Sequence, residues 1–381
     1  AAKERGEGHG ATGYEIIGAK RIRELEPHVT EKAVAALYIR GLGVIHPPEW
    51  SFALTENALQ NGIHLYLNTS VLNIQKTEEE KYVVQTSKGP FKTRFIVNAA
   101  GLFADEIAWM VQDHHIRLTL RKGSIAIFDK SVSHLVRHMI FGTFSESHSQ
   151  NIAPTAHGNL ILGIYYTRPE NKGDTKVSRE GIREIMKLGK ELVPALSERD
   201  IITSFAGILA GNTMMTNGDF YIAPSEHVPG LIHVVAGAPG LTAAPGIADL
   251  VVKMLFDAGI DMEEKKAFQE KRTGWPRFSA AIAEKQEDMI ASNSKYGHII
   301  CRCEKVSEGE VLEAIHRGAS TLDAVKHVTR AGMGRCQGGF CGPLALGLLS
   351  KELSIPVREV TKKGDGSFVT EGPMGERGRN S

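Results

Sequence analysis

The feature that most constrains this chain is the placement of its cysteines. All four cysteines of the 381 residues lie in one 41-residue window that begins at Cys301 and ends at Cys341. Their spacing is C-x-C, then 32 residues, then C-x4-C. The second pair lies in GRCQGGFCG (334–342), where glycines allow the backbone to wrap closely around a bound group. Paired thiols on glycine-rich loops are not typical of unligated structural cysteines, so the spacing predicts a four-thiolate metal site.

Two kinds of metal site take four thiolates. Structural zinc sites usually draw their cysteines from C-x2–4-C pairs, so the C-x-C pair is atypical of zinc. An iron–sulfur cluster also takes four thiolates, and the amides of a glycine-rich surround can donate hydrogen bonds to its sulfurs. The spacing alone favours iron–sulfur over zinc and leaves both interpretations open.

Short helices are expected around the cysteine pairs. Ser307 and Glu310 have the spacing of a capping box that opens a first helix, and Gly318 is expected to close it. Ser320 is the expected cap of a second helix, and a third is expected after Cys341. Each cysteine pair then lies on a loop at a helix end, and we expect these loops to converge on one point.

The segments CRCEKVSEGEVLEAI (301–315) and GMGRCQGGFC (332–341) resemble the bacterioferritin-associated-ferredoxin-like [2Fe–2S] domain. They are most similar to the version fused to the C-terminus of bacterial flavin oxidoreductases. The resemblance covers about 297–353 and implies a small helical domain that holds a [2Fe–2S] cluster. The implied cluster ligands are Cys301, Cys303, Cys336 and Cys341.

Composition excludes several classes of protein. The net charge is +1 and no long block carries one sign, so no basic stripe suggests binding to nucleic acid. The most apolar region, 231–256, is interrupted by glycine and proline, so no transmembrane segment is expected. The polar N-terminal sequence AAKERGEGHGATGYE does not resemble a secretory signal. We expect a cytoplasmic protein, peripheral to the membrane only through a partner.

Two segments have the order strand, glycine turn, helix, which is typical of α/β folds. They are FIVNAAGLFADEIAWMV (95–111) and GLIHVVAGAPGLTAAPGIADLVVKMLF (230–256). Between them, 117–225 alternates strand-like runs with loops, and a helix is expected at 178–193. This pattern predicts an α+β domain with a mixed or antiparallel sheet.

The remaining elements are predicted from turn residues and β-branched runs. A short helix is expected to stop at Pro27, and a second helix at 53–61 is expected to end in a left-handed turn at Asn61-Gly62. Strands are expected at 63–67, 71–76, 81–86 and 91–98. The expected divisions of the chain are an incomplete α/β domain with inserted segments (1–116), an α+β domain (117–225), the C-terminal part of the α/β domain (226–258), a linker (259–296), the domain implied to hold a [2Fe–2S] cluster (297–353) and a polar tail that frays (354–381).

The second glycine turn has the features of a binding site for a cofactor. Gly240 and Thr242 lie at the start of a predicted helix, whose free amides and partial positive charge suit a pyrophosphate or the edge of a reduced flavin. The alternative is that the small residues of both turns only pack a strand against a helix. Five segments of the chain resemble a known family. They are GVIHPPEWSFALTENALQNGI (43–63), VNAAGLFAD (97–105), LRKGSIAIFDK (120–130), APTAHGNLILG (153–163) and PGLTAAPGIA (239–248).

Together these segments resemble the D-amino-acid-oxidase-like FAD-dependent oxidoreductases. The most similar branch contains the large subunit of anaerobic glycerol-3-phosphate dehydrogenase and L-2-hydroxyglutarate-oxidase-like proteins. The resemblance covers nearly the whole chain and implies a Rossmann-like FAD-binding domain with its N-terminal part missing. This partial FAD-binding domain, with inserted substrate-domain segments, covers 1–116, and its C-terminal part covers 226–258. An antiparallel or mixed substrate domain covers 117–225. The residues implied to contact FAD are Val71, Ala99, Ala100, Gly101, Gly240, Leu241 and Thr242.

The chain departs from this family in two places. The family opens with a strand carrying G-x-G-x-x-G, and the glycines of GEGHGATG (6–13) have no apolar strand before them. We therefore expect a fragment, a truncated product or a subunit whose FAD site is completed by a partner chain. Relatives often read FAGIRA where this chain has FAGILA (205–210), so Leu209 replaces an arginine that commonly binds an anionic substrate.

The catalytic candidates are a histidine and a lysine. His46 lies in a segment that faces the flavin in the family and is a candidate base, against the alternative of a loop histidine without a role. Lys122, beside Arg121, is a candidate for stabilising reduced FAD or polarising water, against the alternative of a solvated charge. A turn role is expected for His157. The pair His114-His115 near Asp113 suggests a metal only faintly, and Met214-Met215 is expected to pack in the core.

The resemblances imply an FAD-dependent dehydrogenase of the glycerol-3-phosphate dehydrogenase type with a [2Fe–2S] cluster. Hydride from a small hydroxy or amino acid, or from a polyol phosphate, would reduce FAD, and electrons would leave singly through the cluster to a partner protein or a quinone. Alternatives are a zinc-stapled binding protein, a non-catalytic iron–sulfur subunit for electron transfer, and one component of a heteromeric opine or amine dehydrogenase.

Overall fold

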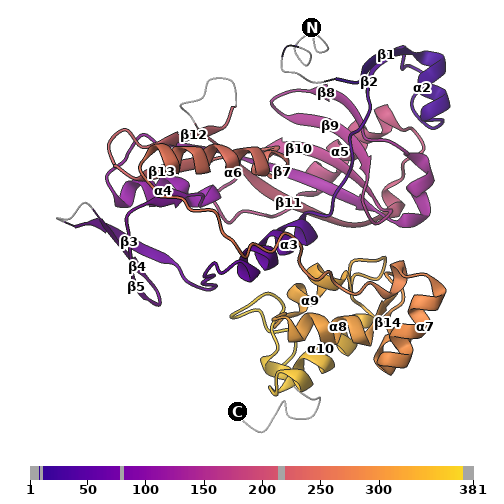
Figure 1. The fold of residues 1–381 in the computed structure, drawn as a ribbon. Helices are drawn as coiled ribbons and strands as arrows, with labels where there is room; N and C mark the ends of the chain where they lie inside the picture. The colour runs from indigo at the N-terminus through magenta and orange to yellow at the C-terminus, as the bar shows by residue number, and fades with distance from the viewer. Residues whose placement is uncertain (1–7, 9–11, 78–80, 213–218, 372–381) are drawn as a thin grey trace, which may run out of the picture.

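The largest sheet has five antiparallel strands in the order β11-β7-β10-β9-β8, and helix α5 packs on one face of it (Figure 1). The computed structural model describes residues 8, 12–77, 81–212 and 219–371. The bounds are β7 Leu118–Phe128, β8 Ile140–Phe144, β9 His148–Pro154, β10 Leu160–Thr167, β11 Ile201–Asn212 and α5 Arg179–Leu192. The sheet expected between 117 and 225 is therefore present, and it is antiparallel throughout. The helix expected at 178–193 is α5, opened by the Ser178 side chain.

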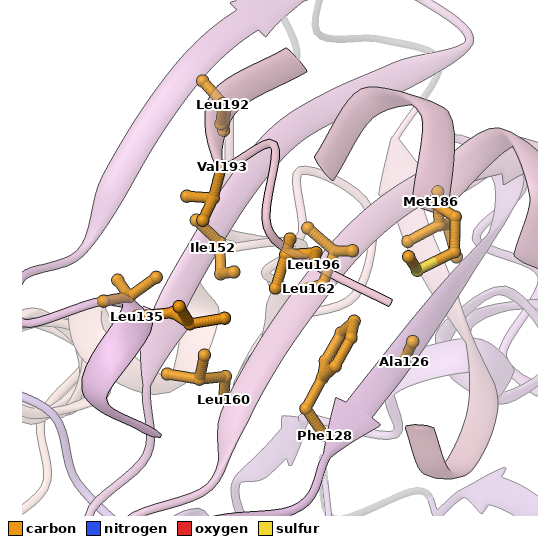
Figure 2. Packing of buried hydrophobic residues seen from close by; sticks show 12 residues of the cluster. Ala126, Phe128, Leu135, Ile152, Leu160, Leu162, Met186, Leu192, Val193 and Leu196 are labelled. Atoms are coloured by element: carbon orange, nitrogen blue, oxygen red, sulfur yellow. The ribbon is translucent and has the colours of Figure 1, made fainter. Parts of the chain in front are cut away.

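The main hydrophobic core lies between this sheet and α5, and Figure 2 shows its packing. In β7, Ser124, Ala126 and Phe128 are buried because alternate side chains of a strand point to the same face. Leu162 of β10 points into the same core. A Cβ on Gly189 of α5 would lie 2.5 Å from a methyl carbon of Leu162, so a larger residue here would force the Leu162 side chain to shift.

A second sheet holds both strand–glycine turn–helix segments that the sequence predicts. Its order is β12-β13-β6, and β13 runs parallel to β6. The bounds are β6 Ile96–Asn98, η1 Gly101–Phe103, α4 Ala104–Met110, β12 Tyr221–Pro224, β13 Leu231–Val235 and α6 Gly240–Asp257. Because parallel strands end at the same edge of a sheet, the turn after β6 and the turn after β13 share one edge. We call this edge, formed by 99–101 and 240–242, the glycine edge.

A third sheet, β3-β4-β5, follows helix α3. The bounds are α3 Pro47–Gln60, β3 Val71–Lys76, β4 Tyr82–Thr86 and β5 Gly89–Thr93. The strand predicted at 71–76 is confirmed, 81–86 is present as β4, and 91–98 divides into β5 and β6. The strand predicted at 63–67 is wrong, because these residues form no ladder with any described strand. The left-handed turn after α3 is confirmed at Gly62, where φ is +86°.

The N-terminal segment forms a hairpin-like pair that the sequence did not predict. Strand β1 (Tyr14–Gly18) pairs antiparallel with β2 (Ala35–Ile39), and helix α2 (Ala19–Leu25) lies between them in the chain. Helix α2 is the short helix expected before Pro27. The backbone of Arg137 and His138 donates hydrogen bonds to the buried Glu26 carboxylate, which attaches this segment to the large domain.

The C-terminal module contains all four cysteines and lies beside α3 (Figure 1). Its elements are α7 Ala283–Ser292, β14 Ile299–Cys301, β15 Val306–Ser307, α8 Glu308–His316, α9 Leu322–Thr329 and α10 Cys341–Glu352. The capping box of Ser307 and Glu310 is confirmed. The cap of α9 is Thr321 rather than Ser320, because Thr321 lies three residues before Ala324 and accepts a hydrogen bond from its amide.

Two segments expected to lack structure are ordered. The predicted linker 259–296 contains α7, and 354–371 of the predicted tail packs against the module. Val360 is completely buried in the module core, and Asp323 donates a backbone hydrogen bond to the Lys362 carbonyl. A buried valine and backbone hydrogen bonds therefore hold 354–371 against the module, although the polar composition of this segment predicted a frayed tail. Among the described residues, no helix is long and apolar enough to cross a membrane.

Candidate functional site

The four cysteines converge in the C-terminal module, as their spacing predicts. Cys301 ends β14 and Cys341 begins α10, and both are buried. The two thiols perturb each other's pKa, which lowers that of Cys301 and raises that of Cys341. Cys303 and Cys336 lie on the loops beside them, and their sulfurs are 3.8 Å apart. Both cysteine pairs therefore present sulfur to one small region at the ends of α9 and α10.

Backbone amides surround these sulfurs. Hydrogen bonds from Cys341 and then from the amides of Gly332 and Glu304 lower the pKa of Cys301 to about 6. The pKa of Cys341 lies above its ordinary value because of its interaction with the Cys301 thiol and because of burial. Amide hydrogen bonds, the largest from Phe340, lower the pKa of Cys336. Amide donors aimed at sulfur suit thiolate ligands, which must be deprotonated to bind iron or zinc.

Glycine is required where the two cysteine loops meet. A Cβ on Gly334 would lie only 2.2 Å from the Cβ of Cys303. Gly332 and Gly338 have φ of +93° and +88°, in the left-handed region that favours glycine. The residues present therefore fit a compact cluster held by four thiolates, and they leave no space for larger side chains between the loops.

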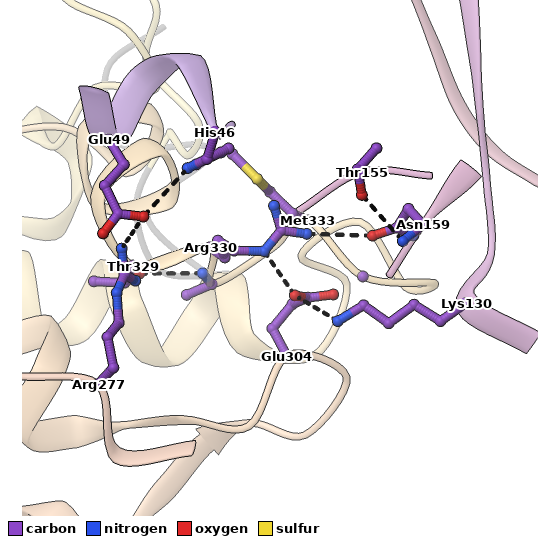
Figure 3. Close-up of polar contacts among 12 residues, drawn as sticks. His46, Glu49, Lys130, Thr155, Asn159, Arg277, Glu304, Thr329, Arg330 and Met333 are labelled. Atoms are coloured by element: carbon purple, nitrogen blue, oxygen red, sulfur yellow. Dashed lines mark hydrogen bonds and ion pairs between the residues drawn. The ribbon is translucent and has the colours of Figure 1, made fainter. Parts of the chain in front are cut away.

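The cysteine loops dock on the end of β7 through charged side chains. Arg335 donates two hydrogen bonds of 3.0 Å to the Asp129 carboxylate, and this holds the pKa of Asp129 well below its usual range. The buried carboxylate of Glu304 accepts from Arg330 (2.8 Å) and from Lys130 (3.0 Å), as Figure 3 shows. Glu304 follows Cys303 and Arg335 precedes Cys336, so two of the docking residues are chain neighbours of cysteines.

The glycine edge contains six of the seven residues implied to contact FAD. Ala99, Ala100 and Gly101 follow β6, and Gly240, Leu241 and Thr242 open α6. Most of these residues are exposed, and the N-terminus of α6 has no side-chain cap. The seventh residue, Val71, begins β3 and packs with the cluster that includes Ile96 of β6. The turns therefore offer small residues and free helix amides together, which fits the requirements of a pyrophosphate-containing cofactor.

A buried polar network under the glycine edge was missed from the sequence. The His233 ring is completely buried, with Nδ1 3.1 Å from the Asn98 amide and Nε2 3.1 Å from the Asp113 carboxylate. Burial alone raises the pKa of Asp113, but hydrogen bonds from Ser225 and His233 outweigh it and lower that pKa to about 2. The network joins β6 to β13 and sets their register. Its members are far apart in sequence, so no local motif reveals it.

The large sheet borders the glycine edge through strand β11, and its face opposite α5 carries Arg121. A Cβ on Gly237 would lie 3.0 Å from the carbonyl oxygen of Ala210 in β11, so the turn before α6 touches this strand. On that face the Arg121 guanidinium lies 3.9 Å from the centre of the Tyr166 ring, and Leu209 is the cross-strand partner of Arg121. Arginine and tyrosine thus lie together on a face near the implied cofactor contacts.

Lys122 lies on the other face of the same strand. Its Nζ is 2.7 Å from a carboxylate oxygen of Asp174, and its side chain is 14% exposed. Successive strand residues point to opposite faces, so Arg121 and Lys122 cannot serve the same side of the sheet. The structure therefore separates the two basic residues that the sequence places together, and the catalytic role of Lys122 stays a prediction.

His46 lies at the junction of α3, the turn between β9 and β10, and the module. It precedes α3, and its ring meets the His157 ring edge-on with 4.8 Å between centres. His157 is in the β9–β10 turn, as expected. Burial, followed by the charge of Arg330, lowers the pKa of both rings, that of His157 to about 4. This turn lies six residues along β10 from Tyr166, or ~20 Å at the usual rise of a strand. The base role of His46 stays a prediction. Met214 and Met215, which were expected to pack in the core, lie outside the described residues.

Comparisons with known proteins match the two parts of the chain that hold the glycine edge and the cysteine site. A family model described as FAD dependent oxidoreductase matches residues 1–254, and one described as BFD-like [2Fe-2S] binding domain matches 299–351. The chain is 35% identical to a glycerol 3-phosphate dehydrogenase of Caloramator mitchellensis over 97% of its own length and 77% of that protein. It is 24% identical to one of the subunits of the anaerobic glycerol-3-phosphate dehydrogenase of Escherichia coli K12, over 67% of this chain and 52% of that one. The solved structure of the L-alpha-glycerophosphate oxidase of Mycoplasma pneumoniae with FAD bound is similar with a TM-score of 0.63, at 26% identity, over 72% of each chain.

Proposed function

The chain belongs to the FAD-dependent oxidoreductase family and carries a BFD-like [2Fe-2S] binding domain, and from this we propose that it is a dehydrogenase of the glycerol-3-phosphate type. It oxidises a small anionic hydroxy substrate beside the glycine edge and passes electrons through a cluster to a partner protein or a quinone. The observation that carries the proposal is the 35% identity to a glycerol 3-phosphate dehydrogenase over 97% of this chain, a span that includes the cysteine module. Arg335 and Asp129 attach this module to the end of β7, in the same domain as the large sheet.

The glycine edge supports FAD as the first cofactor. Small residues at 99–101 allow close approach, and α6 presents free amides to a negatively charged group. When bound, FAD accepts a hydride and releases electrons one at a time. The chain itself contributes position and electrostatics, through the α6 amides and through the buried network of Asn98, His233 and Asp113 that holds β6 and β13 together.

Arg121 supports an anionic substrate. Relatives often carry an arginine where this chain has Leu209, and Arg121 is the cross-strand partner of Leu209 on the same face. We therefore assign substrate binding to Arg121, which takes the place of the missing arginine from the neighbouring strand. The Tyr166 ring orients the guanidinium by cation–π contact. Lys122 is directed to Asp174 on the opposite face, which favours a structural role over the predicted catalytic one.

The outer side of the cysteine site supports a protein electron acceptor. Cys303 is exposed, and the neighbouring Phe340 is 84% exposed, an unusual position for a large aromatic side chain. Exposed aromatic residues are enriched at protein interfaces. The proposed path for electrons therefore leaves the module beside Phe340. The Escherichia coli relative is named as a subunit of a larger dehydrogenase, which is consistent with a partner.

The test is a visible absorption spectrum of anaerobically purified protein, with iron, zinc and flavin analysis. We expect about two irons per chain and the broad charge-transfer absorption of a [2Fe–2S] cluster. Flavin bands in the same spectrum would support FAD at the glycine edge. A colourless protein that contains zinc would overturn the electron-transfer part of the proposal.

A second candidate is an iron–sulfur protein that acquires FAD only when another segment completes the glycine edge. The observation that favours it is the exposure of apolar residues there, including Val97 at 41% and Leu241 at 38%. In the described residues β6 is an edge strand with one side unpaired. This candidate predicts iron without flavin in the purified chain, and flavin after a complementing strand and helix are supplied.

A further inference from the structure

A second cluster of metal-ligating side chains lies outside the cysteine site. His46 precedes α3, Glu49 is in its first turn, and His157 is in the turn between β9 and β10. One ligand atom from each of these residues lies within 4.8 Å of the other two. Figure 3 shows His46 and Glu49 directed toward each other, with Arg277 and Arg330 beside them.

Both histidines hold a buried nitrogen without a hydrogen-bond partner among the described residues. These atoms are Nδ1 of His46 and Nε2 of His157, and His46 is only 13% exposed. Buried polar atoms of folded proteins are nearly always paired, so two such orphans side by side require an explanation. An imidazole nitrogen without a hydrogen-bond partner can offer its lone pair to a metal ion, for which imidazole is the commonest protein ligand.

The neighbouring arginines are already paired with carboxylates. Arg330 is bonded to Glu304, which also accepts from Lys130. Arg277 lies 3.4 Å from the Glu49 oxygen that faces His46, so it orients this carboxylate while partly offsetting its charge. The set of two imidazoles and one oriented carboxylate is a donor set typical of zinc and of non-haem iron(II). The arginines are expected to weaken binding without preventing it.

We propose that His46, His157 and Glu49 bind one divalent transition-metal ion, separate from the cysteine site. The ion joins α3 to the β9–β10 turn. Asn159 of that turn accepts a hydrogen bond from Arg330 of the module (3.3 Å), so the ion stiffens a surface on which the module docks. Metal binding through His46 also excludes the base role predicted for this residue, because a metal-bound imidazole cannot accept a substrate proton at the bound nitrogen.

The test uses the full chain with its cluster and Zn²⁺ as the probe. Iron is measured first, and Zn²⁺ is then titrated anaerobically against a chromophoric chelator. We expect one equivalent of zinc to bind without loss of iron. The substitutions His157→Ala and Glu49→Gln are each expected to weaken binding at least tenfold. His115→Ala is the matched control, because His115 and His227 form another close imidazole pair, with Nε2 atoms 3.4 Å apart, and zinc at His46 leaves this pair untouched.

A second measurement keeps the test valid if a variant is destabilised. Saturating Zn²⁺ is expected to raise the Tm of the wild type and of His115→Ala, and to leave that of His157→Ala unchanged. Equal zinc binding by the wild type and His157→Ala overturns the proposal. So does zinc uptake that displaces iron, which would assign the ion to the cysteines. The cofactor content predicted under the proposed function is measured before zinc is added, so failure of one proposal does not imply failure of the other.

Discussion

The cysteine site and the glycine edge are organised in opposite ways. The cysteine site takes its four sulfurs from 41 consecutive residues and has a buried core of its own beneath them. The glycine edge draws on segments at 99–101 and 240–242, and apolar side chains around it are exposed. A site carried by one short segment folds with that segment. A site assembled from distant strands depends on every neighbour of its sheet being in place.

The largest effect is expected from breaking the cysteine site alone. Cys303→Ser should abolish the visible absorption of the cluster and reduce iron from about two per chain to none, because a hydroxyl is a poor ligand for iron–sulfur clusters. Cys303 is exposed, so the fold around it should persist. Iron analysis and circular dichroism check this outcome. Unchanged iron content would contradict the ligand assignment.

Completing the glycine edge should add a cofactor there, whereas Cys303→Ser removes one from the cysteine site. A fused or co-expressed segment with a strand, G-x-G-x-x-G and a helix should raise bound FAD to about one per chain, because that motif holds the pyrophosphate. The same segment with its glycines replaced by alanine is the control. FAD content that does not rise would show that the exposed edge is not the place where such a segment packs.

Gly334→Ala tests how tightly the cysteine loops meet. The new Cβ would need a shift of the Cys303 loop, and overpacking of this kind costs about 1–3 kcal/mol. We expect a lower Tm and slower or incomplete cluster incorporation. Gly342→Ala is the matched control, because nothing lies within 4 Å of its new Cβ. If both variants behave alike, the loops are looser than the contact implies.

Arg121→Ala tests the substrate side of the glycine edge. Loss of a charge-assisted hydrogen bond costs about 1.5–3 kcal/mol, which corresponds to a roughly 10- to 100-fold rise in the KM for an anionic substrate. Lys122→Ala is the control from the opposite face and should leave KM unchanged. Steady-state kinetics with glycerol 3-phosphate would measure both, once FAD is bound. A rise in KM for Lys122→Ala alone would reverse the assignment.

The smallest effect is expected where the cysteine loops dock on the end of β7. Arg335→Gln removes the partner that depresses the pKa of Asp129. A carboxylate with a depressed pKa stabilises the folded state above its ordinary pKa of 3.8, and this contribution is lost as pH falls through the folded pKa. The Tm difference between wild type and variant should therefore be small and constant at neutral pH and shrink below pH 4. Lys253→Gln, which breaks an exposed pair within α6, is the control.

Local chemistry was readable from the sequence, whereas long-range pairing was not. The capping box at Ser307 depends on neighbours in the chain, and it is present as predicted. The predicted strand at 63–67 failed because a strand needs a partner, and apolar content does not specify one. The network of Asn98, Asp113 and His233 was missed because its residues meet only after β6 and β13 pair.

Alternation along a strand also limits what can be read from neighbouring residues. Arg121 and Lys122 form one basic pair in the sequence, but a strand sends them to opposite faces. The predicted linker and tail show a further limit, because single apolar residues such as Val360 anchor segments whose overall composition is polar. Composition therefore indicates which segments are exposed on average, while individual contacts decide which are ordered.

The docking charges of the module have a consequence for maturation. Glu304 and Arg335 are carried by the loops that wrap the cysteines, so their positions depend on how those loops are folded. An empty module, with its loops unwrapped, would present these charges elsewhere and bind β7 poorly. We therefore expect modules that contain a cluster to dock on β7 and empty modules to stay undocked. Faster proteolysis of 259–282 in iron-free protein would indicate this difference. Equal cleavage of loaded and empty protein would show that docking does not monitor assembly.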